Sequence, residues 1–213
     1  MIRLFCGYDE REASGFHVFA SSVIRRCLEP VQIVALQDLQ RDGSNRFTYA
    51  RYRVPELCHF QGWAIFADAC DMVCLGEMSE LWRLRDERYA VQVVKHSYST
   101  RHRIKYIGTD MECPNLDYPR KNWSSLMLIN CEAPEWRQDW PDGIAAHQFP
   151  HFRDERIGDL PAAWNVLVDE GQDAGGAKIL HYTAGIPGFA HYRDAPMSWA
   201  WREEYRTMSA PHV

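Results

Sequence analysis

The stretch IRLFCGYDEREASGFHVFASSVIRRCLEPVQIVAL, residues 2–36, decides the fold class of this chain. Ile2–Cys6 is a short apolar run that ends in a glycine turn, which is typical of a buried strand. Apolar residues then recur at helical spacing over Glu12–Cys27, and Val31–Leu36 predicts a second strand after Pro30. A strand, a helix and a second strand in this order predict a parallel sheet with crossover helices.

The remaining sequence continues this alternation. Further strands are predicted at Trp63–Ala67, Tyr89–Val94, Ser124–Asn130 and Ala177–Tyr182, and helices at Phe47–Cys58, Met78–Leu84 and Tyr192–Tyr205, with Pro55 kinking or restarting the first of these helices. A polar loop is predicted at Gln40–Asn45. The long polar segment Lys95–Asn122 invites a functional interpretation, because structureless stretches above about 12–15 residues are usually binding loops, lids or disorder. We therefore predict a single α/β domain with a mixed, mostly parallel sheet flanked by helices.

Length and charge narrow the function classes. The chain has 213 residues, with 24 Lys and Arg against 29 Asp and Glu, so its net charge is −5. A protein that coats nucleic acid by phosphate attraction is normally basic, and we expect no nucleic-acid partner. No apolar run approaches the roughly 18 residues needed to cross a bilayer, and the N-terminus lacks a signal peptide. We expect a cytoplasmic protein, with attachment to the inner membrane face as a further option.

The cysteines and paired histidines predict no zinc site. Seven cysteines, an odd number without a C-x-x-C pair, indicate neither a disulfide framework nor a zinc knuckle, and fit a reducing compartment. His147 and His151 have H-x-x-x-H spacing, but Pro150 between them argues against a helix that would bring them together.

Two acids mark the carboxyl end of a predicted strand. In Phe66-Ala67-Asp68-Ala69-Cys70-Asp71-Met72, Asp68 and Asp71 directly follow the strand Trp63–Ala67, at the end where open α/β sheets bind ligands. Nearby carboxylates repel each other unless a cation or a shared proton intervenes, and hard divalent cations prefer carboxylate oxygens. The structural alternative is that Asp68 caps the next turn and Asp71 is a solvated surface acid. His181 ends another predicted strand, and imidazole is a common ligand beside carboxylates.

Several spaced pieces together resemble the family-8 glycosyltransferases and their bacterial relatives, retaining enzymes of the GT-A fold that use nucleotide sugars. Ile2–Cys27 resembles the family's nucleotide-binding start. Thr48–Leu57 resembles the family's helix that carries an arginine near the donor, here Arg51. Asp68–Asp71, with Gly76 and Glu80-Leu81-Trp82, is similar to the family's metal-binding D-x-D motif and the helix after it. Trp123–Asn130 resembles a strand of the family, and His181-Tyr182-Thr183 resembles the C-terminal motif whose histidine completes the metal site.

The resemblance implies a single GT-A-like, Rossmann-like domain over residues 1–213, with a nucleotide-binding half of about 1–95 and an acceptor and metal-completing half of about 96–213. It implies a bacterial, metal-dependent hexosyltransferase that takes a UDP-linked donor and a glycan, lipid or protein acceptor. Mn²⁺ or Mg²⁺ is expected on Asp68 and Asp71, one or both binding directly, with His181. Both acids are the candidate catalytic residues. The nucleotide-binding candidates are Gly7, Tyr8, Arg11 and Arg51, and the acceptor or sugar candidates are Lys95, His96, Asn122, Ser124 and Ser125.

Among the departures from the family pattern, two concern the metal and the diphosphate. Two residues separate the acids where the family has one, and a β-bulge can absorb the difference. The family's lysine near the diphosphate is missing after Thr183, so Arg51, Lys95, Arg120 or Lys121 would have to supply that charge. Two other functions stay open: a noncatalytic nucleotide-sugar or glycan-binding module, and a metal-dependent nucleotidyltransferase, although the sequence after the first strand lacks a glycine- and lysine-rich phosphate loop.

Overall fold

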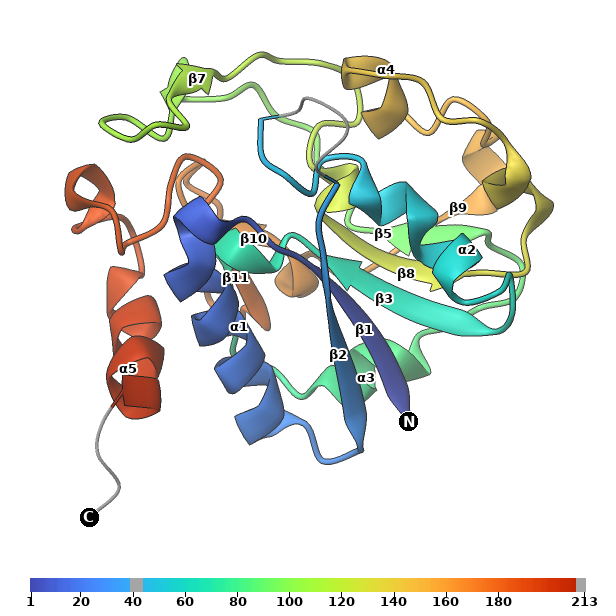
Figure 1. Cartoon of the computed structure of the whole chain (residues 1–213), viewed down its shortest axis with the longest axis horizontal. Helices are drawn as coiled ribbons and strands as arrows, with labels where there is room; N and C mark the ends of the chain where they lie inside the picture. Colours follow the sequence, from blue (N-terminus) through green and yellow to red (C-terminus); the bar gives the residue numbers. More distant parts are fainter. Residues whose placement is uncertain (39–43, 210–213) are drawn as a thin grey trace.

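The central sheet has the strand order β2-β1-β3-β8-β5-β9 (Figure 1) in a computed structural model that describes residues 1–38 and 44–209. Most of the predicted loop Gln40–Asn45 lies outside these residues. The strands are β1 Ile2–Gly7, β2 Val31–Leu36, β3 Trp63–Ala67, β4 Met72–Cys74, β5 Val91–Val93, β6 Ile104–Lys105, β7 Cys113–Pro114, β8 Leu126–Asn130, β9 Ile157–Asp159, β10 Val166–Leu167 and β11 Ile179–His181; the helices are α1 Ala13–Arg26, α2 Val54–Leu57, α3 Met78–Arg83, α4 Ile144–His147 and α5 Ser198–Ser209.

The sheet is mixed, as the sequence predicts. β1 pairs in parallel with β2 and β3, and β5 pairs in parallel with β9. β8 is antiparallel to both of its neighbours, β3 and β5. Residues from both predicted halves of the chain therefore lie in one sheet, since β8 is inserted between β3 and β5.

Alternating side chains of β3 build the core on both faces of the sheet. Ala64 and Phe66 point into a cluster with the aromatic residues that follow β8, including Trp136 and Phe149. Ile65 and Ala67 point into the opposite cluster, with Phe19 and Val23 of α1. This strand is buried on both faces, which explains its continuous apolar sequence.

A second, smaller sheet brings the C-terminal part of the chain to the acidic turn. It has the order β10-β11-β4, and β11 is antiparallel to β4 with His181 opposite Met72. Helix α5 lies outside α1 (Figure 1), and Arg25 and Arg26 of α1 both form ion pairs with the buried Glu204 of α5.

Two expectations for individual elements need correction. The helix expected over Phe47–Cys58 is a 3₁₀ helix, Ala50–Arg53, followed by α2, and Pro55 lies in the first turn of α2, where its missing N–H breaks no helical bond. The polar segment Lys95–Asn122 contains the short β6–β7 hairpin. No helix in the described part of the chain has the length and apolar character needed to span a membrane.

Gly15 of α1 lies against the backbone of the acidic turn, and a Cβ at this position would lie 1.7 Å from the carbonyl oxygen of Cys70. Alanine normally stabilises a helix relative to glycine, but here we expect Gly15→Ala to lower the free energy of unfolding by about 2 kcal/mol or more, because α1 and the turn must separate. Urea denaturation measures this effect. His17→Ala, at an exposed position of the same helix, is the control, and equal stability of the two variants would contradict the prediction.

Candidate active site

A 3₁₀ helix at Ala69–Asp71, directly after β3, positions the two acids. Side chains three residues apart lie on the same side of a 3₁₀ turn, so Asp68 and Asp71 face one side while Cys70 is buried behind them. The Cys70 thiol accepts a hydrogen bond from the Asp9 N–H at 3.3 Å. The two-residue spacing of the acids is therefore accommodated by a 3₁₀ turn and not by the β-bulge that the sequence allowed.

Neither acid is a solvated surface residue, and Asp68 does not cap the turn through its side chain. Their exposed fractions are 9% for Asp68 and 5% for Asp71. Burial and the neighbouring charge of Asp71 raise the pKa of Asp68 to about 6, although Arg51 and His181 act in the opposite direction. The structural alternative for this motif is therefore wrong.

Arg51 holds Asp68 with both ends of its guanidinium. Its Nη2 lies 2.8 Å from Asp68 Oδ1, and its Nη1 donates to Asp68 Oδ2 at 3.3 Å. The same side chain donates to the carbonyl oxygens of Thr48 at 2.9 Å and Ser124 at 2.8 Å. Arg51 thus joins the segment before α2, the acidic turn and the start of β8.

His181 faces Asp71 from the end of β11. Its Nε2 lies 3.2 Å from Asp71 Oδ1, and its Nδ1 lies 2.9 Å from Asn165 Oδ1. The Asn165 amide nitrogen donates to Ser125 Oγ at 2.9 Å, which fixes its oxygen toward the histidine. Burial alone would lower the pKa of His181, but the charge of Asp71, supported by Asp68 and Asp169, raises it above its ordinary value.

These side chains line a polar cavity of about 70 Å³. Of the residues that the sequence predicts for the site, the structure brings together Arg51, Asp68, Asp71, Asn122, Ser124, Ser125 and His181. A larger cavity of about 330 Å³ continues from it and shares Lys105, Tyr118 and His147 among its walls. Its other walls come from the segment before Asn122 and from α4.

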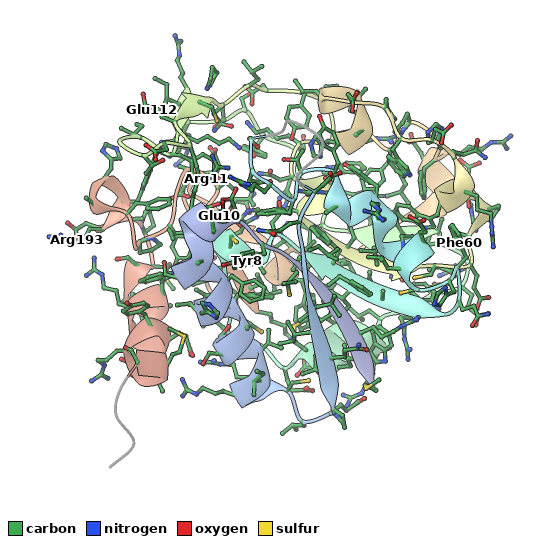
Figure 2. The ribbon with its side chains drawn as sticks, viewed as in Figure 1. Tyr8, Glu10, Arg11, Phe60, Glu112 and Arg193 are labelled. Atoms are coloured by element: carbon green, nitrogen blue, oxygen red, sulfur yellow. The ribbon has the colours of Figure 1, made fainter. Side chains whose placement is uncertain are left out.

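The three predicted nucleotide-binding residues near β1 do not line either cavity. Figure 2 shows Tyr8 and Arg11 beside the N-terminal end of α1. The Tyr8 ring packs edge-on against Phe16 with 5.1 Å between centroids, and Arg11 pairs with the buried Asp9 at 2.5 Å. Gly7 lies against Phe47, whose ring would be 2.3 Å from an added Cβ. Gly7 therefore does permit a close approach, but that of a side chain from the same protein.

Lys95 and His96 also lie outside both cavities. Lys95 forms an ion pair with Asp159 at 3.2 Å. His96 is buried, and its Nδ1 lies 3.3 Å from the amide nitrogen of Gln172. Burial and the charge of His181 lower the pKa of His96 to about 3.

The structure adds residues that the sequence analysis did not assign to this site. His147 of α4 lines both cavities, and its Nδ1 lies 3.0 Å from both the Tyr52 and the Ser124 hydroxyl. In the sequence, His147 could be recognised only as a histidine, and its spacing to His151 raised the hypothesis of a zinc pair instead. Glu12 is fully buried, and neither of its carboxyl oxygens has a hydrogen-bond partner in the described residues. Burial and the charges of Asp71 and Asp9 raise the pKa of Glu12 well above its usual range.

The residues fit a divalent metal in donor chemistry but are not arranged as a complete ligand set. Among residues 1–38 and 44–209, no group of three or more His, Cys, Asp or Glu side chains is placed to hold a metal ion. However, Asp71 Oδ1 is a buried acceptor that receives no hydrogen bond and has His181 Nε2 at 3.2 Å, whereas Asp68 Oδ1, which also receives no hydrogen bond, is already ion-paired with Arg51. The contact with Asn165 leaves His181 Nε2 facing Asp71, as in histidines oriented by an outer partner for metal binding. Carboxylate oxygens and imidazole suit Mn²⁺ and Mg²⁺.

Solved structures of glycosyltransferases share this fold. Galactosyltransferase LgtC, solved with donor and acceptor sugar analogs, matches 99% of this chain and 98% of its own with a TM-score of 0.65 at 12% identity. GlyE of Streptococcus pneumoniae has a TM-score of 0.63 at 13% identity, and the bifunctional glycosyltransferase WbbM 0.65 at 14%. This chain spans 61% of the GlyE chain and about half, 49%, of the WbbM chain. The fold is that of the GT-A glycosyltransferases.

No family model matches the chain. Protein CDI of Arabidopsis thaliana is 34% identical over 225 residues, which cover 95% of this chain and 85% of CDI. The chain belongs to the family of protein CDI. This relative is a plant protein, so a bacterial origin remains a prediction of the sequence alone.

The burial of the Arg51–Asp68 ion pair leads to a prediction about the free energy of unfolding. We expect Arg51→Met to destabilise the protein by about 3 kcal/mol or more, because it leaves the Asp68 carboxylate buried without its cation. Adding Asp68→Asn to Arg51→Met removes that charge and should restore part of the loss. Urea denaturation at pH 7.5 measures both. A double variant that is no more stable than Arg51→Met would contradict the assignment of the loss to an unpaired charge.

The burial of His147 leads to a prediction about how the stability of the protein depends on pH. Burial, followed by the positive charges of Arg51 and Lys105, lowers the pKa of His147 to about 3. Since the unfolded chain has an ordinary pKa near 6.5 at this position, the contribution to stability is present above about pH 6.5 and is lost as the pH falls toward 3. Wild type should therefore lose more stability between pH 7 and pH 4 than His147→Gln. Parallel curves of unfolding free energy against pH would count against a buried, neutral imidazole.

Proposed function

We propose that this protein is a glycosyltransferase that moves a sugar from a nucleotide diphosphate-sugar, UDP-linked, to an acceptor hydroxyl with divalent-metal help and retention of configuration. The observation that carries the proposal is the 3₁₀ turn after β3, which aims Asp68 and Asp71 into one polar cavity opposite His181. The fold shared with solved glycosyltransferases supports it.

Asp71 and His181 are the residues that would hold Mn²⁺ or Mg²⁺ directly. Asp68 already has Arg51 on both of its carboxyl oxygens, whereas the one ion pair of Asp71 among the described residues is with the His181 imidazole. Asp68 therefore acts as a second charge beside the ion or as a contact to the donor. When bound, the metal neutralises negative charge that develops on the departing diphosphate.

The residues of the chain itself orient the reactants. Arg51 fixes the Asp68 carboxylate, and Asn165 fixes the tautomer and the ring orientation of His181. In the transfer, the bond between the anomeric carbon and the diphosphate oxygen breaks, the acceptor oxygen bonds the same carbon on the same face, and the hydroxyl proton passes to the departing diphosphate. Preorganised charge and substrate orientation would supply the main rate effects.

The two connected cavities support separate places for donor and acceptor. The smaller cavity, with its acids, suits the diphosphate and the transferred sugar. The larger one has apolar walls from Leu116 and Ile144 together with polar groups, which suits a sugar ring or an apolar aglycone of a glycan, lipid or protein acceptor. Ser124, Ser125 and Asn122 lie on the smaller cavity, where they are candidates for sugar contacts.

Metal-dependent nucleotide binding tests the proposal. We expect wild type to bind UDP at least about tenfold more tightly with Mn²⁺ than with EDTA, and Asp71→Asn to lose this difference because a neutral amide is a poor metal ligand. Isothermal titration calorimetry measures the affinities. The control is Asp194→Asn, an exposed acid that lines neither cavity, which should behave as wild type.

Turnover then distinguishes the remaining functions. Mass spectrometry of UDP released from a panel of UDP-sugars, with and without added glycosides, should show transfer or slow hydrolysis that requires Asp71. Binding without either reaction would favour a noncatalytic nucleotide-sugar module. Metal-dependent UDP affinity that survives Asp71→Asn would contradict the assigned metal ligand.

A further inference from the structure

Lys105 lies at the junction of the two cavities, and no carboxylate among the described residues forms an ion pair with it. It lines the smaller cavity together with Asp71 and His181, and it also lines the larger one. Among the described residues, its ammonium group forms no ion pair; it lies 4.9 Å from the centroid of the Tyr106 ring, and its charge also acts on the buried carboxyl group of Glu12. An unpaired cation that faces a cavity is available for an anionic ligand.

The backbone around Lys105 is fixed from both sides. The Tyr106 N–H donates to the carbonyl oxygen of Ala184 at 2.7 Å, and the Tyr106 side chain is 1% exposed. Tyr192 also receives a hydrogen bond from the N–H of Ile107 at 2.9 Å. These contacts hold Lys105 beside Thr183, the residue after which the sequence carries no lysine.

The other basic residues considered for the diphosphate are already engaged. Arg51 is held by Asp68 and two carbonyl groups, and Lys95 pairs with Asp159. Arg120 pairs with Asp154 and donates to the Gln148 carbonyl oxygen. Lys121 donates to Asn115 Oδ1 at 2.7 Å and to the Leu116 carbonyl oxygen at 2.8 Å. None of these four has the freedom of Lys105.

The surroundings of Lys105 favour an anion on the cavity side. His147 lines the same cavity as Arg51 and Lys105, and burial, followed by the charges of these two residues, lowers its pKa. Burial lowers the pKa of Lys121, and the charge of Lys105 acts in the same direction, so the two ammonium groups repel each other across the larger cavity. A bound phosphate would relieve this repulsion. In the smaller cavity, Lys105 would also offset the repulsion between that phosphate and the Asp71 carboxylate.

We propose that Lys105 binds the diphosphate oxygens of the nucleotide donor and so takes the place of a lysine on the segment after Thr183. This inference rests on the proposed function. It assigns the phosphate-binding charge to the β6–β7 hairpin, which lies beyond the N-terminal end of α1 (Figure 1) and belongs to the polar segment for which the sequence invites a functional interpretation.

Matched variants test the assignment. Lys105→Met and Lys105→Gln remove the charge, Lys105→Arg keeps it, and Lys178→Met removes a partly exposed lysine that pairs with Glu80 away from both cavities. Calorimetry with Mn²⁺ measures the affinity for UDP, GDP, ADP and inorganic pyrophosphate, and for uridine as a ligand without phosphate. Thermal unfolding of each variant shows that it is folded.

We expect Lys105→Met and Lys105→Gln to weaken binding of the preferred nucleoside diphosphate and of pyrophosphate about tenfold or more, and to leave uridine binding unchanged. Lys105→Arg should stay within about threefold of wild type, and Lys178→Met should equal it. Unchanged diphosphate affinity in the two neutral variants, with wild type binding normally, would overturn the assignment and leave the proposed function standing. No binding of any nucleoside diphosphate by wild type would overturn the proposed function and the role of Lys105 with it.

Discussion

The ion pair between Arg51 and Asp68 is the interaction on which the site depends. Asp68 and Asp71 leave water together, and two carboxylates in one buried cavity repel each other. The planar guanidinium meets both oxygens of Asp68 and also bonds the backbone of Thr48 and Ser124. One side chain thereby compensates the buried charge and fixes three segments around it. Asp71 is left with His181 as its neighbour, which is the arrangement a cation would complete.

The three strands of the first 67 residues and the position of the acids could be predicted from the sequence. Residues 2–36 alternate as a strand, a helix and a strand must, and the acids follow a strand buried on both faces. Because parallel strands present their carboxyl ends at one edge, the rule that places ligands there also found Asp68 and Asp71. His181 was found by the same reasoning, applied to a strand in the smaller sheet.

The parts that escaped prediction depend on contacts between distant segments. β8 lies between β3 and β5 and is antiparallel to both, and the local sequence pattern of a strand does not indicate which strands it pairs with. His147 meets Tyr52 across 95 residues of sequence, and Asn165 meets His181 from a segment without regular periodicity. Near β1 the sequence predicted that Gly7 and Tyr8 contact a nucleotide. In the structure Gly7 lies against Phe47, and the Tyr8 ring packs against Phe16. Their roles in nucleotide binding stay predictions.

The hydrogen bond between the Tyr106 amide and the Ala184 carbonyl joins two connecting segments of the chain. The segment before β7 and the segment after β11 are in contact through this hydrogen bond, so an insertion or deletion in one segment would displace the other. Length changes in these two connections are therefore expected to occur together among related chains. A homologue that shortens one of them alone would have to rebuild this wall of the smaller cavity from different residues.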